Sequence, residues 1–229
     1  TWSDYEIRSL YARGTFDYNN IIYLDYSVRN DWSSALPINA NSYLYPSFSA
    51  SFVFSDLLKE SRISNSLSFG KLRAAFGRVG SDLGAYQLHA AYGLGTPYGS
   101  NPTMGVPTTV YDPNIKPSLS KEYEIGTELQ FFRNRLGLDF SWYKKDAIDM
   151  ILPLSVTPSS GSATIFINAG LIRSKGWDLI INATPVKTTD FSWDLTFNLA
   201  RNISEVIDLD TSRNLRNYSL GTGTFGPTV

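Results

Sequence analysis

Eight segments of the chain alternate apolar and polar residues with a period of two, which is the pattern of strands with one apolar and one polar face. The segments lie at about residues 6–18, 22–29, 44–54, 71–79, 122–132, 136–143, 176–183 and 193–200. In residues 136–143, for example, an apolar set alternates with a polar one: Leu136, Leu138, Phe140 and Trp142 against Gly137, Asp139, Ser141 and Tyr143. The pattern predicts eight antiparallel strands, with a short helical turn at 56–61.

The connections between these segments alternate between short and long. Short polar turns are expected at 19–20, 133–135 and 187–190, because Asn and Asp tolerate the positive φ angles of tight hairpins. Long loops are expected at 31–42, 80–120 and 148–170. Aromatic residues gather near segment ends, as in Phe131-Phe132 and Trp142-Tyr143. Both features are typical of outer-membrane β-barrels, with short periplasmic turns, long extracellular loops and aromatic girdles at the interfaces.

Two architectures fit this pattern. In a transmembrane barrel the apolar faces meet lipid, whereas in a soluble β-sandwich they pack against a second sheet. No window approaches 18 consecutive apolar residues, so a closed barrel is the way in which this chain would cross a bilayer. The pattern favours the barrel. A soluble or surface-attached sandwich that binds glycans without transport stays open as the alternative.

Composition narrows the possible functions. Aromatic residues make up 14% of the chain and charged residues 18%, the latter below the roughly 25% usual in soluble domains. With 20 basic and 21 acidic residues, the chain has no excess of positive charge with which to bind the phosphates of nucleic acid. The chain has no cysteine and a single histidine, His89, so we expect no metal site, no cofactor and no Ser-His-Asp triad. The carboxylates of Glu122 and Glu124 are best explained as part of the water-facing wall of a lumen, and no enzyme activity is expected.

Two long stretches resemble the late barrel strands of the SusC/RagA-like family of TonB-linked outer-membrane proteins. They are DPNIKPSLSKEYEIGTELQFFRNRLGLDFSWYKKDAIDMILPLSV (112–156) and INAGLIRSKGWDLIINATPVKTTDFSWDLTFNLARNISEVIDL (167–209). RNDWSSALPINANSYLYPSFSASFVFSD (29–56) and GKLRAAFGRVG (70–80) fit the same family in the same order.

The resemblance implies an all-β fold in which residues 1–229 form part of one transmembrane β-barrel domain, about eight of roughly 22 strands. The plug, the amino-terminal domain, the TonB-contact segment and the final strands are expected to lie outside the chain. It also implies a bacterial outer-membrane transporter, surrounded by outer-membrane lipid, that imports oligosaccharides or peptides. The import would be driven by the TonB complex, with a SusD-like surface lipoprotein as a lid. A passive porin or a β-barrel enzyme is a weaker option.

Two groups of residues are candidates for contact with a substrate. Aromatic side chains in the expected loops suit sugar faces and peptides, although they also suit the packing of loops on one another: Trp32, Tyr86, Tyr92, Tyr98 and Tyr111. Charged residues on the polar faces are expected to line the lumen and to steer substrate, or to form cross-strand pairs that stiffen the wall: Arg13, Asp25, Arg29, Arg73, Glu124, Glu128, Asp139, Asp178 and Asp194.

Overall fold

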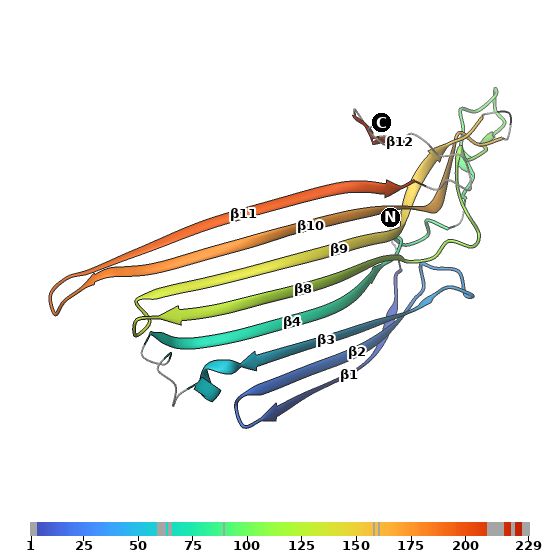
Figure 1. Ribbon diagram of the computed structural model, residues 1–229. Helices are drawn as coiled ribbons and strands as arrows, with labels where there is room; N and C mark the ends of the chain where they lie inside the picture. Colours follow the sequence, from blue (N-terminus) through green and yellow to red (C-terminus); the bar gives the residue numbers. More distant parts are fainter. Residues whose placement is uncertain are drawn as a thin grey trace.

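Eight long strands form one antiparallel sheet in chain order (Figure 1). The computed structural model describes residues 4–58, 63, 66–88, 90–157, 159, 161–209, 218–220 and 223–225. The long strands are β1 (Ile7–Tyr18), β2 (Ile22–Ser33), β3 (Ser42–Val53), β4 (Leu67–Ser81), β8 (Ser118–Phe131), β9 (Leu136–Ser155), β10 (Thr164–Lys187) and β11 (Ser192–Asp208). The shorter elements are the 3₁₀ helix η1 (Phe54–Leu58), β5 (Gly93–Leu94), β6 (Met104–Gly105), β7 (Thr109–Tyr111), β12 (Tyr218–Leu220) and β13 (Gly223–Phe225). The predicted all-β fold with eight antiparallel strands is confirmed.

The register of the strands separates polar from apolar side chains across the whole sheet. One row of directly paired residues crosses all eight strands on what we call the polar face: Arg13, Ser27, Ser47, Gly77, Glu122, Lys145, Ser174 and Ser204. A second row crosses them on the opposite, apolar face: Tyr18, Ile22, Phe52, Leu72, Thr127, Phe140, Leu179 and Leu199. A slip of one residue in any strand would mix the two sets, so the hydrophobic pattern fixes the register.

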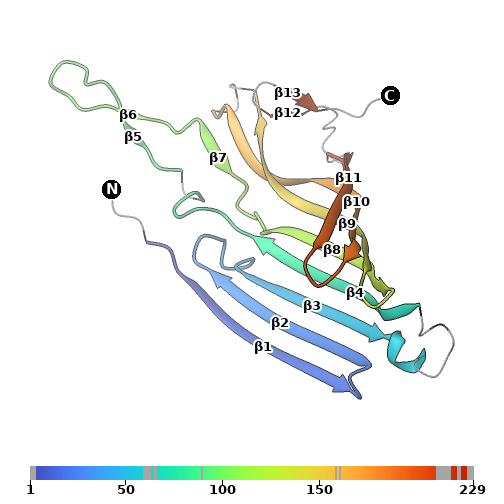
Figure 2. The same cartoon turned by 90° about the vertical axis from the view of Figure 1, so that its left-hand side faces the viewer.

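The apolar face is not covered by another part of the described chain. Phe48, Ile125 and Phe197 are 49%, 59% and 57% exposed, although residues of this type are normally buried in a soluble protein. The long strands lie in a single layer in both views (Figures 1 and 2). The β-sandwich alternative is therefore wrong, because it requires a second sheet over these side chains. An uncovered apolar surface of this extent marks a site of interaction with lipid or protein.

Short turns join the strands at one end of the sheet. Asn19 and Asn20 have φ angles of 53° and 56°, the left-handed conformation that a two-residue hairpin needs and that Asn tolerates. Phe132, Arg133 and Asn134 take similar positive values. η1 covers the start of the predicted helical turn at 56–61, whose last residues lie outside the described part of the chain. The short-turn prediction is confirmed at these two hairpins and at 187–190, where β10 ends at Lys187 and β11 begins at Ser192.

The prediction of a long loop at 148–170 is wrong. β9 continues to Ser155 and β10 begins at Thr164. The two-residue period was hidden because Asp149 and Gly170, opposite one another in the hairpin, both have positive φ and interrupt the ladder. Pro153 lies beyond Ile148, where the pairing of β8 with β9 ends, so it sits at an edge-like position that accepts proline. This pair of strands therefore extends past its neighbours.

A small hydrophobic core lies at the long-loop end of the sheet. It joins residues from the 34–41 connection, β3 and the long connection between β4 and β8, and we call it the rim cluster: Ala35, Leu36, Tyr43, Leu83 and Ile115, packed against Tyr45, Leu88, Tyr111, Ile151 and Phe166. Ile115 has no exposed surface at all. The rim cluster holds the long connections against the ends of the strands.

Candidate functional site: the polar face and its rim

A groove of about 1260 Å³ follows the polar face. Its lining includes charged side chains from β1, β2, β8 and β9: Arg13, Asp25, Arg29, Glu122, Glu124 and Lys145. Hydroxyl groups from Ser27, Ser47 and Ser49 lie between them. The groove therefore offers water and polar solutes a wall of hydrogen-bonding groups.

All nine charged residues predicted to line a lumen lie on the polar face. Several make contacts within the sheet. Asp25 accepts a hydrogen bond of 2.7 Å from the hydroxyl of Thr15, and Asp194 accepts one of 2.6 Å from Thr184. Arg13, Glu128 and Asp178 stand on the same face by the strand register. Their role toward a substrate stays a prediction.

Arg73 shows how the sequence builds one of these contacts. Its guanidinium donates to both carboxylate oxygens of Asp139, at 3.2 and 2.7 Å, and lies 3.5 Å from a carboxylate oxygen of Glu124. β8 separates β4 from β9, so the side chain must cross it. It does so over Gly126, where an added Cβ would lie 2.6 Å from Arg73 Nε. The missing side chain at Gly126 thus opens the path for this bidentate pair.

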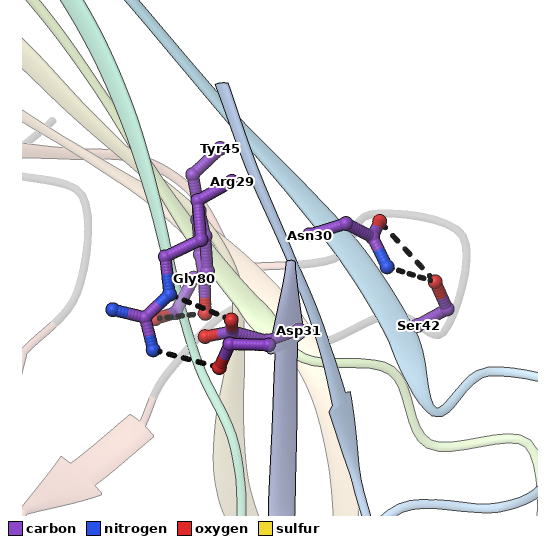
Figure 3. Close-up of polar contacts among 7 residues, drawn as sticks. Arg29, Asn30, Asp31, Ser42, Tyr45 and Gly80 are labelled. Carbon is purple, nitrogen blue, oxygen red and sulfur yellow. Dashed lines mark hydrogen bonds and ion pairs between the residues drawn. The ribbon is translucent and has the colours of Figure 1, made fainter. Parts of the chain in front are cut away.

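A second polar network lies near the rim (Figure 3). Arg29 Nε donates to Asp31 at 2.7 Å, and Arg29 Nη2 donates to the hydroxyl of Ser9 on β1 at 3.0 Å. The Tyr45 hydroxyl donates to the Gly80 carbonyl oxygen at 3.4 Å. On the other side of β2, the Asn30 amide donates to Ser42 at 3.0 Å. These bonds join the ends of β1 to β4 into one unit.

Asp31 and Tyr45 were not among the predicted site residues. The sequence did carry a signal, since the alternation of β2 continues past Arg29 to the buried Asp31 and Ser33. Tyr43 and Tyr45 alternate in the same way, with ring centroids 5.0 Å apart. Extending the period to the ends of the strands would have found them.

Asn168 fastens the connection before β8 to β10. Its amide nitrogen donates to the carbonyl oxygens of Lys116 at 2.7 Å and Asp149 at 2.9 Å, while its oxygen accepts from the Lys116 amide at 2.6 Å. The bonds place the side chain of Ile115 in the rim cluster. The two sequence stretches that carry the family resemblance, one with Ile115 and the other with Asn168, therefore meet in space.

We expect the isosteric change Asn168→Asp to loosen residues 112–117. The carboxylate cannot donate to the two carbonyl oxygens, and each lost bond is worth about 1 kcal/mol. Amide hydrogen exchange in 112–117 should become faster. Asn182→Asp is the matched control, because Asn182 accepts a bond from Thr196 at 2.9 Å and a carboxylate also accepts. Equal effects of the two changes would contradict the role of Asn168.

The family model described as TonB dependent receptor-like, beta-barrel matches residues 1–225. The chain belongs to this family. The resemblance to SusC/RagA-type proteins is confirmed, as is the assignment to the outer-membrane receptor barrels, which are not enzymes.

Two curated relatives illustrate the similarity. TonB-dependent receptor P3 of Formosa agariphila is 26% identical over 215 residues, which is 92% of this chain and 21% of that protein. TonB-dependent receptor SusC of Bacteroides thetaiotaomicron is 23% identical over 215 residues, again 21% of its length. The chain thus spans about a fifth of the curated relatives that it matches.

Solved structures share the fold of the receptor barrel. The RagAB peptide transporter superposes with a TM-score of 0.85 at 24% identity, covering 97% of this chain and 24% of that chain. The siderophore receptor PirA from Pseudomonas aeruginosa gives a TM-score of 0.59 at 19% identity, covering 89% of this chain and 35% of the other. At these identities the likeness concerns the fold alone.

Four of the five aromatic candidates of the receptor barrel fall into two groups. Tyr86, Tyr92 and Tyr98 lie in the long connection between β4 and β8 and are 59%, 64% and 84% exposed. Tyr111 lies on β7, and its ring stacks on Phe166 at 4.5 Å between centroids and 9° between planes. Burial in this contact raises the pKa of the Tyr111 hydroxyl. Tyr111 therefore matches the alternative in which a ring packs a loop.

The prediction that Trp32 lies in a loop is wrong. β2 extends to Ser33, and Trp32 pairs with Arg8 and Ser42 inside the sheet. It points away from the side of the buried Asp31 and Ser33. The predicted loop at 31–42 begins too early, because the pairing of β1 with β2 continues to Ile7 and Ser33.

We expect Tyr98→Ala and Tyr111→Ala to separate the two roles of the aromatic candidates. Loss of the stacked, partly buried Tyr111 ring should lower the free energy of unfolding by about 1–3 kcal/mol. Loss of the exposed Tyr98 ring should leave it unchanged and, if that ring meets substrate, weaken substrate binding. Urea titration and a binding measurement on each variant of the full-length receptor check this. A large loss of stability at Tyr98 would contradict it.

The described residues hold no group of His, Cys, Asp and Glu side chains suited to a metal ion. None of them belongs to a helix long and apolar enough to cross a membrane. His89, the single histidine, lies outside the described residues.

Outside the strands, Tyr5 donates to Asp82 at 2.7 Å, and partial burial together with this bond raises the pKa of Tyr5 to about 12.

Proposed function

We propose that this chain is part of the barrel wall of a TonB-driven outer-membrane importer for oligosaccharides or peptides that works with a SusD-like surface lipoprotein. The observation that carries the proposal is the single-layer sheet with one continuous polar face and one uncovered apolar face. A wall of this kind separates lipid on one side from an aqueous lumen on the other. The plug, the TonB-contact segment and the remaining strands belong to the longer protein in this proposal.

The charge of the polar face favours uncharged or cationic substrates. In its long strands, carboxylates outnumber cations: Asp17, Asp25, Asp31, Glu122, Glu124, Glu128, Asp139, Asp178 and Asp194 against Arg13, Arg29, Lys71, Arg73, Lys145 and Lys187. A wall with an excess of one sign repels solutes of that sign. Neutral oligosaccharides and basic or neutral peptides therefore fit this part of the wall better than acidic ones.

The long-loop end is the side on which a lid would act. The rim cluster and the network of Arg29, Asp31 and Tyr45 fasten the connections there, while Tyr92 and Tyr98 remain exposed beyond them. A rigid rim that carries exposed rings suits contact with a substrate or with a surface partner. The solved relative named RagAB is described as a peptide transporter, which supports peptides as one of the two substrate classes.

Uptake in the strain that encodes the receptor tests the proposal. The gene is deleted, and uptake of labelled neutral oligosaccharides and peptides is compared after complementation with the full-length receptor or with a version lacking its TonB-contact segment. We expect uptake of one class to return with the intact receptor alone. Equal rescue by both versions would contradict TonB-driven import, and unchanged uptake after deletion would contradict a role in nutrient import.

A further inference from the structure

The apolar face changes character toward the long-loop end. Toward the short-turn end its rows are almost entirely apolar. Toward the long-loop end, charged residues from β4, β8, β9, β10 and β11 form what we call the cationic band: Arg78, Lys121, Lys144, Arg173, Lys175 and Arg201, with the carboxylates Asp146, Glu205 and Asp208. Six cations against three carboxylates leave the band positive. It stands on the face opposite to the groove, so it does not serve the proposed substrate path.

Asp146 and Glu205 already have cationic partners within the band. Asp146 accepts two bonds from Arg173, at 2.7 and 3.0 Å, and lies 3.8 Å from Lys144 Nζ. Glu205 lies 4.0 Å from Lys175 Nζ. Among the described residues, Arg78 and Lys121 have neither an ion pair nor a side-chain hydrogen bond, and the buried Nε of Arg78 has no acceptor. Arg78 therefore lacks a partner, while Lys121 has only Asp146, already bonded to Arg173, as its cross-strand neighbour on β9.

Arg78 and Lys121 are also directly opposite each other in the register of β4 and β8. Like charges in this position destabilise a sheet, and a buried N–H without an acceptor adds a further cost. An anion held between the outer ends of the two side chains would offset the repulsion between them. Arginine and lysine together suit a phosphate group, since one supplies a planar fork of donors and the other a compact charge.

The position of Arg78 and Lys121 along their strands, relative to the aromatic rings on the same face, identifies the source of that anion. The next outward-facing residues toward the short-turn end are Phe76 and Tyr123, whose ring centroids lie 5.0 Å apart, and one row further Trp142 pairs with Trp177. Aromatic rings of this kind mark the boundary between hydrocarbon and headgroups. A cation just beyond them stands at headgroup level, beside the polar ends of lipids.

We propose that the Arg78–Lys121 pair, assisted by Lys144, binds the phosphate of an anionic lipid in the outer leaflet, whose acyl chains lie over Phe76 and Tyr123. The proposal rests on the proposed function in one respect, that the apolar face meets lipid. It adds a fixed lipid site to the outside of the wall, separate from the transport path.

Lipid selectivity of the full-length receptor tests this proposal. The receptor is reconstituted in nanodiscs of phosphatidylcholine with phosphatidylglycerol, and the phosphatidylglycerol retained after detergent extraction is counted by native mass spectrometry. Each basic residue near an anionic surface is worth about a five-fold change in binding. We therefore expect Arg78→Gln/Lys121→Gln to lower retention about thirty-fold, with smaller losses for either single change and for Lys144→Gln.

Lys145→Gln is the matched control, because Lys145 is the next residue of β9 and lies on the polar face; retention should not change. A parallel arm adds inorganic phosphate, which should not displace the lipid since it lacks acyl chains. Displacement by phosphate would overturn the lipid assignment in favour of a free-anion site. Equal retention in the double variant would overturn the site itself.

The outcome also separates this proposal from the one on which it rests. A receptor that inserts in nanodiscs but shows no preference for phosphatidylglycerol contradicts the lipid site and leaves the transporter proposal standing. A receptor that stays folded in plain buffer and does not insert contradicts both. If the double variant does not fold, the two single variants carry the test.

Discussion

Arginine in place of Phe140 is expected to lower the stability of the membrane-inserted receptor by about 2–4 kcal/mol, the cost of a charge at the bilayer midplane on a barrel exterior. Phe140 pairs with Thr127, which lies midway along β8 between Tyr123 and Phe131. Those two aromatic levels are about 26 Å apart along the strand at about 3.3 Å per residue, so Phe140 stands near the centre of the apolar band. Its side chain is 40% exposed in the sheet, and in the membrane that surface meets lipid.

Ser141→Arg is the matched control for this change. Ser141 follows Phe140 on β9 but lies on the polar face, between Gly126 and Asp178. An arginine there projects into water between Asp178 and the Arg73 guanidinium over Gly126. Attraction and repulsion largely offset each other, so the free energy of unfolding should change by less than about 1 kcal/mol. Urea titration of both variants in phospholipid vesicles measures the difference. The opposite order of effects would mean that the two faces have been assigned the wrong way round.

Valine in place of Gly176 is expected to prevent β10, β11 and β9 from pairing correctly, with a loss of at least about 3 kcal/mol. A Cβ at this position would collide with the backbone carbonyl oxygen of Arg201 and with the hydroxyl of Tyr143, 2.6 Å away. A tyrosine ring can turn aside, but the carbonyl oxygen belongs to the neighbouring strand and cannot move without disturbing the ladder. The folded fraction of the full-length receptor in the outer membrane, measured by heat-modifiable mobility, should fall sharply.

Gly77→Val is the control for the glycine substitution. Gly77 also lies on the polar face, and a Cβ there meets nothing within 4 Å. Its strand, β4, is flanked by β3 and β8, so the two positions share the same kind of environment. We expect Gly77→Val to assemble normally, because β-branched residues suit strands. A similar loss of folded receptor in both variants would show that the clash at Gly176 is not the cause.

Much of the fold could be predicted from the sequence, because a period of two in side-chain polarity is a local property. Phe140 and Asp139, for example, take opposite faces in the structure as their alternation indicates. Asn19 and Asn20 form the expected hairpin for an equally local reason, their tolerance of positive φ. The nine charged candidates share one face because the register preserves that alternation across the sheet.

The errors arose where tertiary pairing extends a strand beyond its local signal. β9 and β10 continue past Asp149 and Gly170, whose positive φ angles break the period, and Trp32 belongs to a longer β2 than its sequence suggests. Tyr111 lies in a stretch with the composition of a loop, yet its ring stacks on Phe166, which belongs to a strand more than fifty positions later. The rim cluster could not be predicted, since it depends on how the long connections fold back on the strand ends.

The site was predicted in part for a similar reason. The polarity of Arg73 and Asp139 places both on one face, but the contact between them requires the gap at Gly126 on the intervening strand. The order of the strands had to be known before that gap could be recognised. The cationic band likewise becomes visible only when Arg78 and Lys121 are found opposite each other.

The orientation of β9 in the membrane is the most direct test of the whole account. The chain contains no cysteine, so single spin labels can be placed at 137–142 in the full-length receptor, once any cysteines elsewhere have been replaced. Collision rates with oxygen, which concentrates in lipid, and with a water-soluble nickel complex are then measured at each position. We predict high oxygen and low nickel collision at 138, 140 and 142, with the reverse at 137, 139 and 141. Equal collision rates on both sides of the strand, or protection of the even positions from lipid, would contradict a membrane-spanning wall.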